Sequence, residues 1–247
     1  MLDRRLRLLL GCQPNWFSVV EKAGGRAAGT ASIKVNAPDC ITRYELEIVG
    51  HRDAIRVREI KEAARLPGRC AERHIELDGW FCLGLDAGSG ISDRKAAATW
   101  WERLHKFLRL QRSATRNGIW PDRYALAHGH AGVHHQAAIA IAAQLGLSEE
   151  YEALLLSRPS RLSAGAPLLM SRVDRYKNGR APCPCGCAPL KGRRRLRRNC
   201  SWLSSILPLL IRERSRQREL AKFWAAERAA GTSCCGTMKS CPLRDAA

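Results

Sequence analysis

The stretch TASIKVNAPDCITRYELEIVGHRDAIRVREIK, residues 30–61, alternates apolar and polar residues in three successive runs. Such alternation is typical of β-strands that bury one face, and Pro38, Asp39 and Gly50 separate the runs. A similar run precedes the stretch, so four strands are predicted, at residues 16–22, 30–37, 43–50 and 54–61. Because the connections between them are short, we expect an antiparallel meander with one buried face.

Helices are expected on both sides of these strands. The N-terminal MLDRRLRLLL is amphipathic, and residues 93–111 predict a longer helix with Asp93 as its N-cap. The residues on the predicted apolar face of that helix are Trp101, Leu104, Leu108 and Gln111. Further helices are expected at residues 130–147, 148–157 and near 211–230. Strands followed by helices indicate an α+β fold and not alternating βαβ units.

Composition narrows the class of protein. The chain has 247 residues and a net charge of +19, and residues 171–228 hold 16 basic against 4 acidic residues. No run approaches the roughly 20 apolar residues of a membrane span, so we expect a cytoplasmic protein that does not enter membranes. The chain has 11 cysteines. In the cytoplasm, cysteines are more often metal ligands or catalytic thiols than disulfides.

One cysteine stands out by its surroundings. Cys82 lies between Phe81 and Leu83 in RCAERHIELDGWFCLGLDAG, residues 69–88. It has three interpretations: a small core side chain, a metal ligand or a nucleophile. The glycine turn at Gly79 and the glycine-rich loop that follows Cys82 favour an accessible thiol, and His74 lies eight residues earlier.

The segment HIELDGWFCLGL, residues 74–85, resembles the active-site stretch of ubiquitin-conjugating (E2) enzymes, in particular bacterial E2-like proteins. In that family a His-Pro-Asn-Ile segment leads through a glycine to an Ile- or Val-Cys-Leu, which Ile75, Gly79 and Phe81-Cys82-Leu83 match. The expected order of elements is also similar: helix, four-strand antiparallel meander, cysteine loop and C-terminal helices. The resemblance therefore implies a ubiquitin-conjugating-enzyme-like fold with Cys82 as the catalytic thiol.

The motif departs from the family at one point, because His74 is followed directly by Ile75 and the Pro-Asn pair is absent. In the family that asparagine stabilises the oxyanion formed when a lysine attacks the thioester, a contribution of about 10²–10³ in rate for such donors. His74 has two open interpretations here, a replacement donor or a structural loop residue. Bacterial E2-like proteins, some of them in phage-defence or conjugation operons, tolerate this loss.

The resemblance implies an E2-like transferase that carries a ubiquitin-like protein as a Cys82 thioester. Its implied partners are an E1-like activating enzyme and the ubiquitin-like protein, with a JAB-type isopeptidase expected in the same operon. The acyl group would pass from Cys82 to an amine or a thiol, and the E1 would spend the ATP.

The tail carries a second pattern, PCPCGCAPLKGRRRLRRNC, with cysteines at 183, 185, 187 and 200. Closely spaced thiolates followed by a distant one are able to form a tetrahedral zinc site. The segment resembles the SEC-C type of zinc knuckle, in which Cys183 and Cys185 match the first ligand pair and Cys200 a later ligand. Cys187 is one candidate for the fourth ligand, and the alternatives are Cys234, Cys235 and Cys241. The predicted cofactor is structural zinc.

The expected organisation is an E2-like catalytic domain at residues 1–157, a linker at 158–182 and a cysteine-rich basic tail at 183–247. Six of the eight residues from 191 to 198 are basic, so an alternative function is a non-catalytic E2-like scaffold whose zinc-dependent tail binds nucleic acid. Another alternative is a thiol redox sensor that joins Cys82 to Cys70. The roles of the helix-borne histidines stay open between packing and metal binding; they are His128, His130, His134 and His135.

Overall fold

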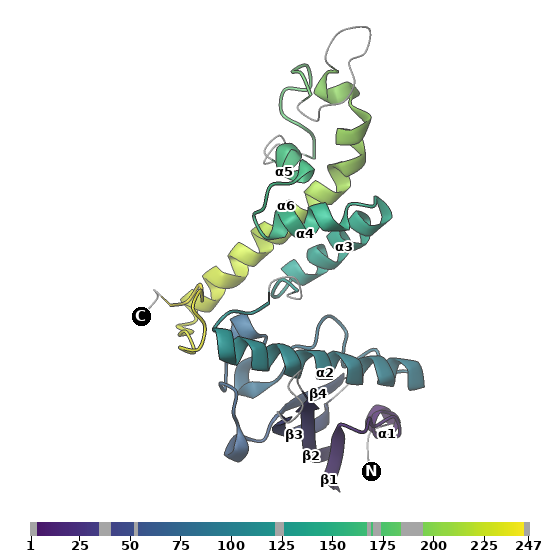
Figure 1. The fold of residues 1–247 in the computed structure, drawn as a ribbon, viewed down its shortest axis with the longest axis vertical. Helices are drawn as coiled ribbons and strands as arrows, with labels where there is room; N and C mark the ends of the chain where they lie inside the picture. Colours follow the sequence, from purple (N-terminus) through teal and green to yellow (C-terminus); the bar gives the residue numbers. More distant parts are fainter. Residues whose placement is uncertain are drawn as a thin grey trace. The chain divides into compact units, whose positions relative to one another are not determined.

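A four-stranded antiparallel sheet with strand order β1-β2-β3-β4 forms the centre of the N-terminal part of the chain (Figure 1). The computed structural model describes residues 4–34, 41–51, 54–121, 126–166, 169, 174–183 and 195–244. The strands are β1 Phe17–Ala23, β2 Arg26–Lys34, β3 Ile41–His51 and β4 Ala54–Glu59. The predicted meander is confirmed, and each strand pairs with the next one in sequence.

Helices α1 (Arg4–Leu10) and α2 (Arg94–Asn117) complete this part of the fold. The Asp93 side chain accepts a hydrogen bond from the Ala96 N–H, as expected of an N-cap. The four residues predicted to share a face of α2 are all buried. The Tyr44 hydroxyl of β3 donates to the Leu108 carbonyl, and Trp101 Nε1 donates to the Leu9 carbonyl of α1. The helices and the sheet therefore share one core.

The chain divides into two compact units, Met1–Pro121 with Glu227–Ala247, and Asp122–Ala226. In the first unit, the C-terminal segment 232–244 buries Met238 and Leu243. The Lys239 N–H donates to the Gly118 carbonyl at 2.7 Å, and Arg69 forms an ion pair with Glu227 at 2.7 Å. Residues far apart in sequence thus complete the unit that contains the sheet.

The second unit is helical, with α3 Ala131–Gln144, α4 Ser148–Leu155, α5 Arg161–Gly165, the short turn η6 Arg197–Asn199 and most of α6 Ser201–Ala229. Helix α6 begins about ten residues before its predicted start, because it continues through Pro208. Leu209 and Leu210 are buried in the unit's core, which also holds Leu162 from the stretch predicted as a linker. Among helices built from the described residues, none is long and apolar enough to cross a membrane.

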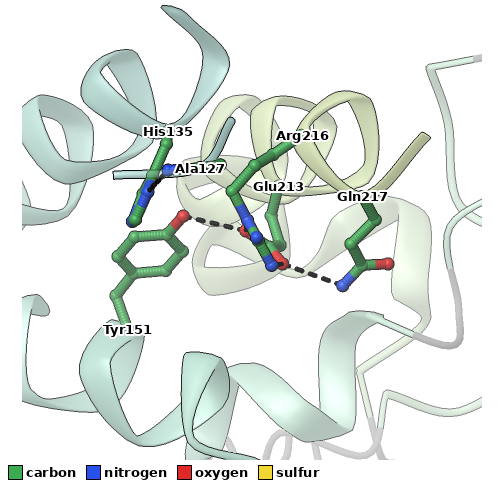
Figure 2. A network of polar contacts seen from close by, with 6 residues as sticks. All are labelled: Ala127, His135, Tyr151, Glu213, Arg216 and Gln217. Carbon is green, nitrogen blue, oxygen red and sulfur yellow. Dashed lines mark hydrogen bonds and ion pairs between the residues drawn. The ribbon is translucent and has the colours of Figure 1, made fainter. Parts of the chain in front are cut away.

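A buried polar network joins three helices of the second unit (Figure 2). The Tyr151 hydroxyl donates to Glu213 at 2.8 Å, and Arg216 holds both oxygens of the same carboxylate at 2.7 Å. His135 lies beside the Tyr151 ring, and its Nδ1 accepts a hydrogen bond from the Ala127 N–H. A buried charge is usually paired and hydrogen-bonded, and the Glu213 carboxylate is both.

His135 makes the stability of this unit pH-dependent. Burial lowers the pKa of His135 to about 4, and the charge of Arg216 acts in the same direction. Between that pKa and the ordinary value of about 6.5, only the unfolded chain binds the proton, so acid favours unfolding. The full stabilisation is present above pH 6.5. We expect the free energy of unfolding to fall by about 2 kcal/mol between pH 7 and pH 5 on this account.

Urea denaturation of His135→Gln over the same pH range measures this effect. The glutamine keeps an acceptor for the Ala127 N–H but does not titrate, so its pH profile should be flatter by that amount. His130→Gln, at an exposed position at the start of α3, is the matched control and should keep the wild-type profile. A His135→Gln profile as steep as that of the wild type would contradict the assignment.

Candidate active site around Cys82

Backbone hydrogen bonds fix the position of Cys82 next to β4. The Phe81 N–H donates to the Val57 carbonyl at 2.9 Å, and the Cys82 N–H donates to the His74 carbonyl at 2.9 Å. Ile75 forms isolated bridges with both Cys70 and Phe81. The segments 70–75 and 80–82 thus form a short irregular extension beside the sheet, and Cys82 lies at its edge.

Left-handed backbone conformations are concentrated around this cysteine. Of the five described non-glycine residues with positive φ, three flank it: His74 at 55°, Asp78 at 60° and Asp86 at 54°. Gly84, two residues after the cysteine, has φ of 113°. Such conformations cost free energy in residues that carry a Cβ atom, and they cluster at functional sites.

The Cys82 side chain is half-buried. Burial raises the pKa of the Cys82 thiol, the Gly84 N–H at the sulfur opposes the rise, and the carboxylate of Glu76 adds to it. The thiol is therefore protonated at neutral pH and must lose its proton when it attacks an electrophile. The Gly84 N–H stabilises the thiolate that this step creates.

His74 supports the cysteine with its main chain. Its side chain is only 8% exposed, and the imidazole ring packs against Trp120 with the ring centroids 5.3 Å apart. Its carbonyl is the acceptor for the Cys82 N–H. Of the two interpretations left open by the sequence, this geometry favours a structural loop residue over a donor at the thiol.

Two arginine side chains that lie over the Trp80 ring were not identified from the sequence. The guanidinium groups of Arg56 and Arg58 lie 4.7 and 4.3 Å from the centroid of this ring. Trp80 itself is two residues before Cys82 in sequence. Arg56 also pairs with Glu76 at 3.0 Å. The signal was present in the i, i+2 spacing of the two arginines, which places both on one face of β4.

The glycine-rich loop after Cys82 is packed against the sheet. The Ile55 N–H donates to the Gly88 carbonyl at 3.0 Å, and a Cβ on Gly88 would lie 2.2 Å from the Ile55 carbonyl oxygen. On the helix side, Arg103 donates to the Leu85 carbonyl. The loop is therefore held from both sides, and Gly88 is required for its close approach to β4.

The predicted zinc ligands are only partly described. Cys185, Cys187 and residues 191–194 of the basic run lie outside the described residues, as does Cys40. The Cys183 N–H donates to the Arg195 carbonyl at 2.7 Å, and Pro182 pairs with Leu196, so residues 182–183 and 195–196 lie side by side. Among the described residues, no group of three or more His, Cys, Asp and Glu side chains suits a metal ion.

Cys183 and Cys200 nevertheless lie in one neighbourhood. Burial raises the pKa of the Tyr176 hydroxyl, and both cysteines add to that rise from nearby. Cys200 is fully buried and its sulfur accepts a hydrogen bond from the Leu203 N–H at the start of α6. The alternative fourth ligands, Cys234, Cys235 and Cys241, belong instead to the first unit.

Comparison with known families covers most of the chain. Residues 16–122 match the family described as "Prokaryotic E2 domain", and residues 127–243 match the family described as "Cysteine-rich domain, C-terminal to E2 domain". No curated protein and no solved structure matches the chain. The second match includes the segment 227–243, which in the structure belongs to the unit that contains the sheet. The chain belongs to the prokaryotic E2 proteins in which a cysteine-rich domain follows the E2 domain.

Proposed function

We propose that the chain carries a ubiquitin-like protein as a thioester on Cys82 and transfers it to an amine or thiol acceptor. The observation that carries the proposal is the position of Cys82, half-buried at the edge of the sheet of a prokaryotic E2 domain. Its main chain is fixed by His74 while its sulfur lies beside the Gly84 N–H. This arrangement suits a thiol that must be held in place to attack a thioester carbonyl.

In the proposed step, the Cys82 sulfur attacks the thioester carbonyl of the modifier on an E1-like partner. The S–C bond to the partner breaks, the new S–C bond to Cys82 forms, and the proton of the Cys82 thiol ends on the departing thiolate. Glu76 is a carboxylate whose charge reaches the sulfur and raises the pKa of the Cys82 thiol. The Arg56 pair keeps Glu76 in place.

A pocket that is lined in part by Phe81, the residue before Cys82, is the proposed seat of the modifier's extended C-terminal peptide. It is lined by Glu59, Lys61, Ala64, Leu66, Pro67, Gly68, Arg69, Leu77, Asp78, Gly79 and Phe81. Leu77 is 63% exposed, an apolar side chain at the edge of the pocket five residues from the thiol. A peptide lying there would place its C-terminal carbonyl near Cys82, and the exposed leucine would cover apolar peptide atoms.

The absence of the Pro-Asn pair limits the acceptor. With His74 packed on Trp120, the loop has no asparagine-like side chain at the motif position to support the oxyanion of lysine attack. A thiol is a better nucleophile than an amine toward a thioester, so its transition state depends less on that support. The proposal therefore favours a thiol acceptor over a lysine.

A charging assay tests the function. Incubation of the chain with ATP, a cognate E1-like enzyme and its ubiquitin-like protein should give an adduct with one modifier per chain, which thiol reductant cleaves. The charged chain is then separated and mixed with free lysine or with a free thiol at equal concentration. We expect faster discharge onto the thiol. An adduct that resists reductant, or no adduct at all, would exclude the carrier role.

We further propose that the cysteine-rich domain holds a structural zinc ion with Cys183, Cys185, Cys187 and Cys200. The supporting observations are the pairing of residues 182–183 with 195–196 and the shared neighbourhood of Cys183 and Cys200. Bound zinc would cross-link the segment at Cys183 to the start of α6, in place of a larger apolar core.

Metal analysis of the purified chain should show about one zinc per chain, because four thiolates complete one tetrahedral site. A Cys183→Ser, Cys200→Ser variant should lose it, whereas Cys12→Ser, in the first unit, should not. Full zinc content in the double variant would place the metal elsewhere.

A further inference from the structure

Two cysteines outside the proposed carrier site lie against each other in the first unit. The sulfurs of Cys70 and Cys235 are 2.8 Å apart, although the residues are 165 positions apart in sequence. A disulfide bond is about 2.05 Å long, so less than about 1 Å of movement separates this pair from a covalent link. The sequence-based pairing of Cys70 with Cys82 does not describe this contact.

The surroundings of the pair are those of a reactive dithiol. Cys235 is half-buried, and its sulfur lies 3.1 Å from the Thr237 hydroxyl. The Arg73 side chain is 1% exposed and donates from its two terminal nitrogens to Thr237 and Thr115 and to the Gln111 carbonyl. A buried guanidinium whose described hydrogen bonds go to neutral groups favours a negative charge nearby.

The pKa values of the two thiols are shifted in opposite directions. Burial raises the pKa of Cys70, and its contact with Cys235 raises it further. Burial opposes ionisation of Cys235 too, but its hydrogen bonds to Cys70 and Thr237 and the charge of Arg73 hold its pKa below the ordinary value. Cys235 is also the less buried of the two cysteines, so we expect it to act as the nucleophile and Cys70 as the resolving thiol.

We propose that Cys70 and Cys235 form an oxidisable dithiol, which a peroxide converts into a disulfide. This disulfide would link the segment 232–244 to the segment 70–75 before Cys82. The Cys235 thiolate attacks one peroxide oxygen, the O–O bond breaks, and the departing oxygen takes a proton to leave as water or an alcohol. The Cys70 sulfur then attacks the resulting sulfenic acid, the S–O bond breaks, and the hydroxide leaves with the Cys70 proton as water. The peroxide is reduced by two electrons and the two thiols are oxidised by two.

Backbone contacts connect the proposed disulfide to the carrier site at Cys82. Cys70 exchanges two backbone hydrogen bonds with Ile75, and Ile75 bridges to Phe81, the neighbour of Cys82. The dithiol itself does not depend on the carrier function. A chain with Cys82→Ser should form the disulfide at the wild-type rate, so the two proposals fail separately.

Peptide mapping of the full chain tests the proposal. The chain is reduced, freed of reductant, treated with one equivalent of hydrogen peroxide, alkylated with iodoacetamide and digested with trypsin. Cleavage after the basic residues leaves Cys70 in the peptide CAER, residues 70–73, and Cys235 in AAGTSCCGTMK, residues 229–239. We expect these two peptides to be joined, with the loss of two hydrogens and no alkylation of Cys70.

Three variants make the result specific. Cys235→Ser should abolish the joined peptide, and Cys234→Ser, its neighbour in the same peptide, should retain it. Thr237→Val, at an exposed position, should slow the oxidation because it removes a hydrogen bond at the Cys235 sulfur.

Several outcomes would overturn the proposal. They are a main disulfide from Cys70 to the peptide that carries Cys82, full alkylation of Cys70 after peroxide treatment, or a joined peptide that survives Cys235→Ser. Zinc that stays in a Cys183→Ser, Cys200→Ser chain and leaves on peroxide treatment would also overturn it, because the pair would then be metal ligands.

Discussion

Cys82→Ser should remove every reductant-labile adduct that the wild-type chain forms with a ubiquitin-like protein. The hydroxyl either fails to attack the E1 thioester or gives an oxyester, which thiol reductant does not cleave. The loss should be complete, because no other nucleophile replaces the sulfur in the covalent intermediate. Non-reducing and reducing gels of the same reaction separate the thioester, the oxyester and an amide.

Two other cysteines serve as matched controls. Cys12, whose sulfur contacts the Arg94 carbonyl, and Cys70, whose sulfur contacts Cys235, are both in the first unit. Cys12→Ser and Cys70→Ser should therefore keep the labile adduct. If Cys82→Ser retained it and one of the controls lost it, the carrier would be that other cysteine.

Gly88→Ala should destabilise the first unit by about 3 kcal/mol, at the upper end of the usual cost of overpacking. The added Cβ would lie 2.2 Å from the Ile55 carbonyl oxygen and 3.0 Å from the Ile55 nitrogen, and a backbone strand has little room to move. The loop must then leave β4, which breaks the Ile55-to-Gly88 hydrogen bond. Urea denaturation measures the loss, and the charging assay should show slower thioester formation because the loop adjoins Cys82.

Gly68→Ala is the control for this substitution. Gly68 lies in the same unit and lines the proposed peptide pocket, and a Cβ added there would have no heavy atom within 4 Å. Its alanine variant should have wild-type or slightly higher stability, since alanine restricts the unfolded chain. Equal stabilities for the two alanine variants would show that the loop after Cys82 is not packed on β4 as described.

The sheet and α2 were predictable because their signals are local. Alternating apolar residues mark β2 to β4, and an apolar stripe with a capping aspartate marks α2. Gln111 on that stripe was also informative, since a fully buried amide needs partners, and it exchanges hydrogen bonds with Arg73. The early start of α6 was not predictable, because Pro208 usually marks a helix boundary and only its packed neighbours override it.

The candidate site was predictable only at its centre. The resemblance of residues 74–85 to the E2 motif singled out Cys82, and the match of residues 16–122 confirms the domain that carries it. Two features depend on tertiary packing: the arginines over the Trp80 ring, and the contact of Cys70 with Cys235. The two cysteines are 165 positions apart in sequence. No local pattern specifies such a pair.

The return of residues 227–244 to the sheet-containing unit has a consequence for synthesis on the ribosome. The first 121 residues emerge early, but Met238 and Leu243, which are buried in the same unit, are made more than about a hundred residues later. At about 5–20 residues per second, that interval lasts roughly 5 to 20 seconds. The nascent E2 domain therefore has an uncovered apolar surface during this interval, when a chaperone has time to bind it, and it reaches its final form only after residues 227–244 have been made.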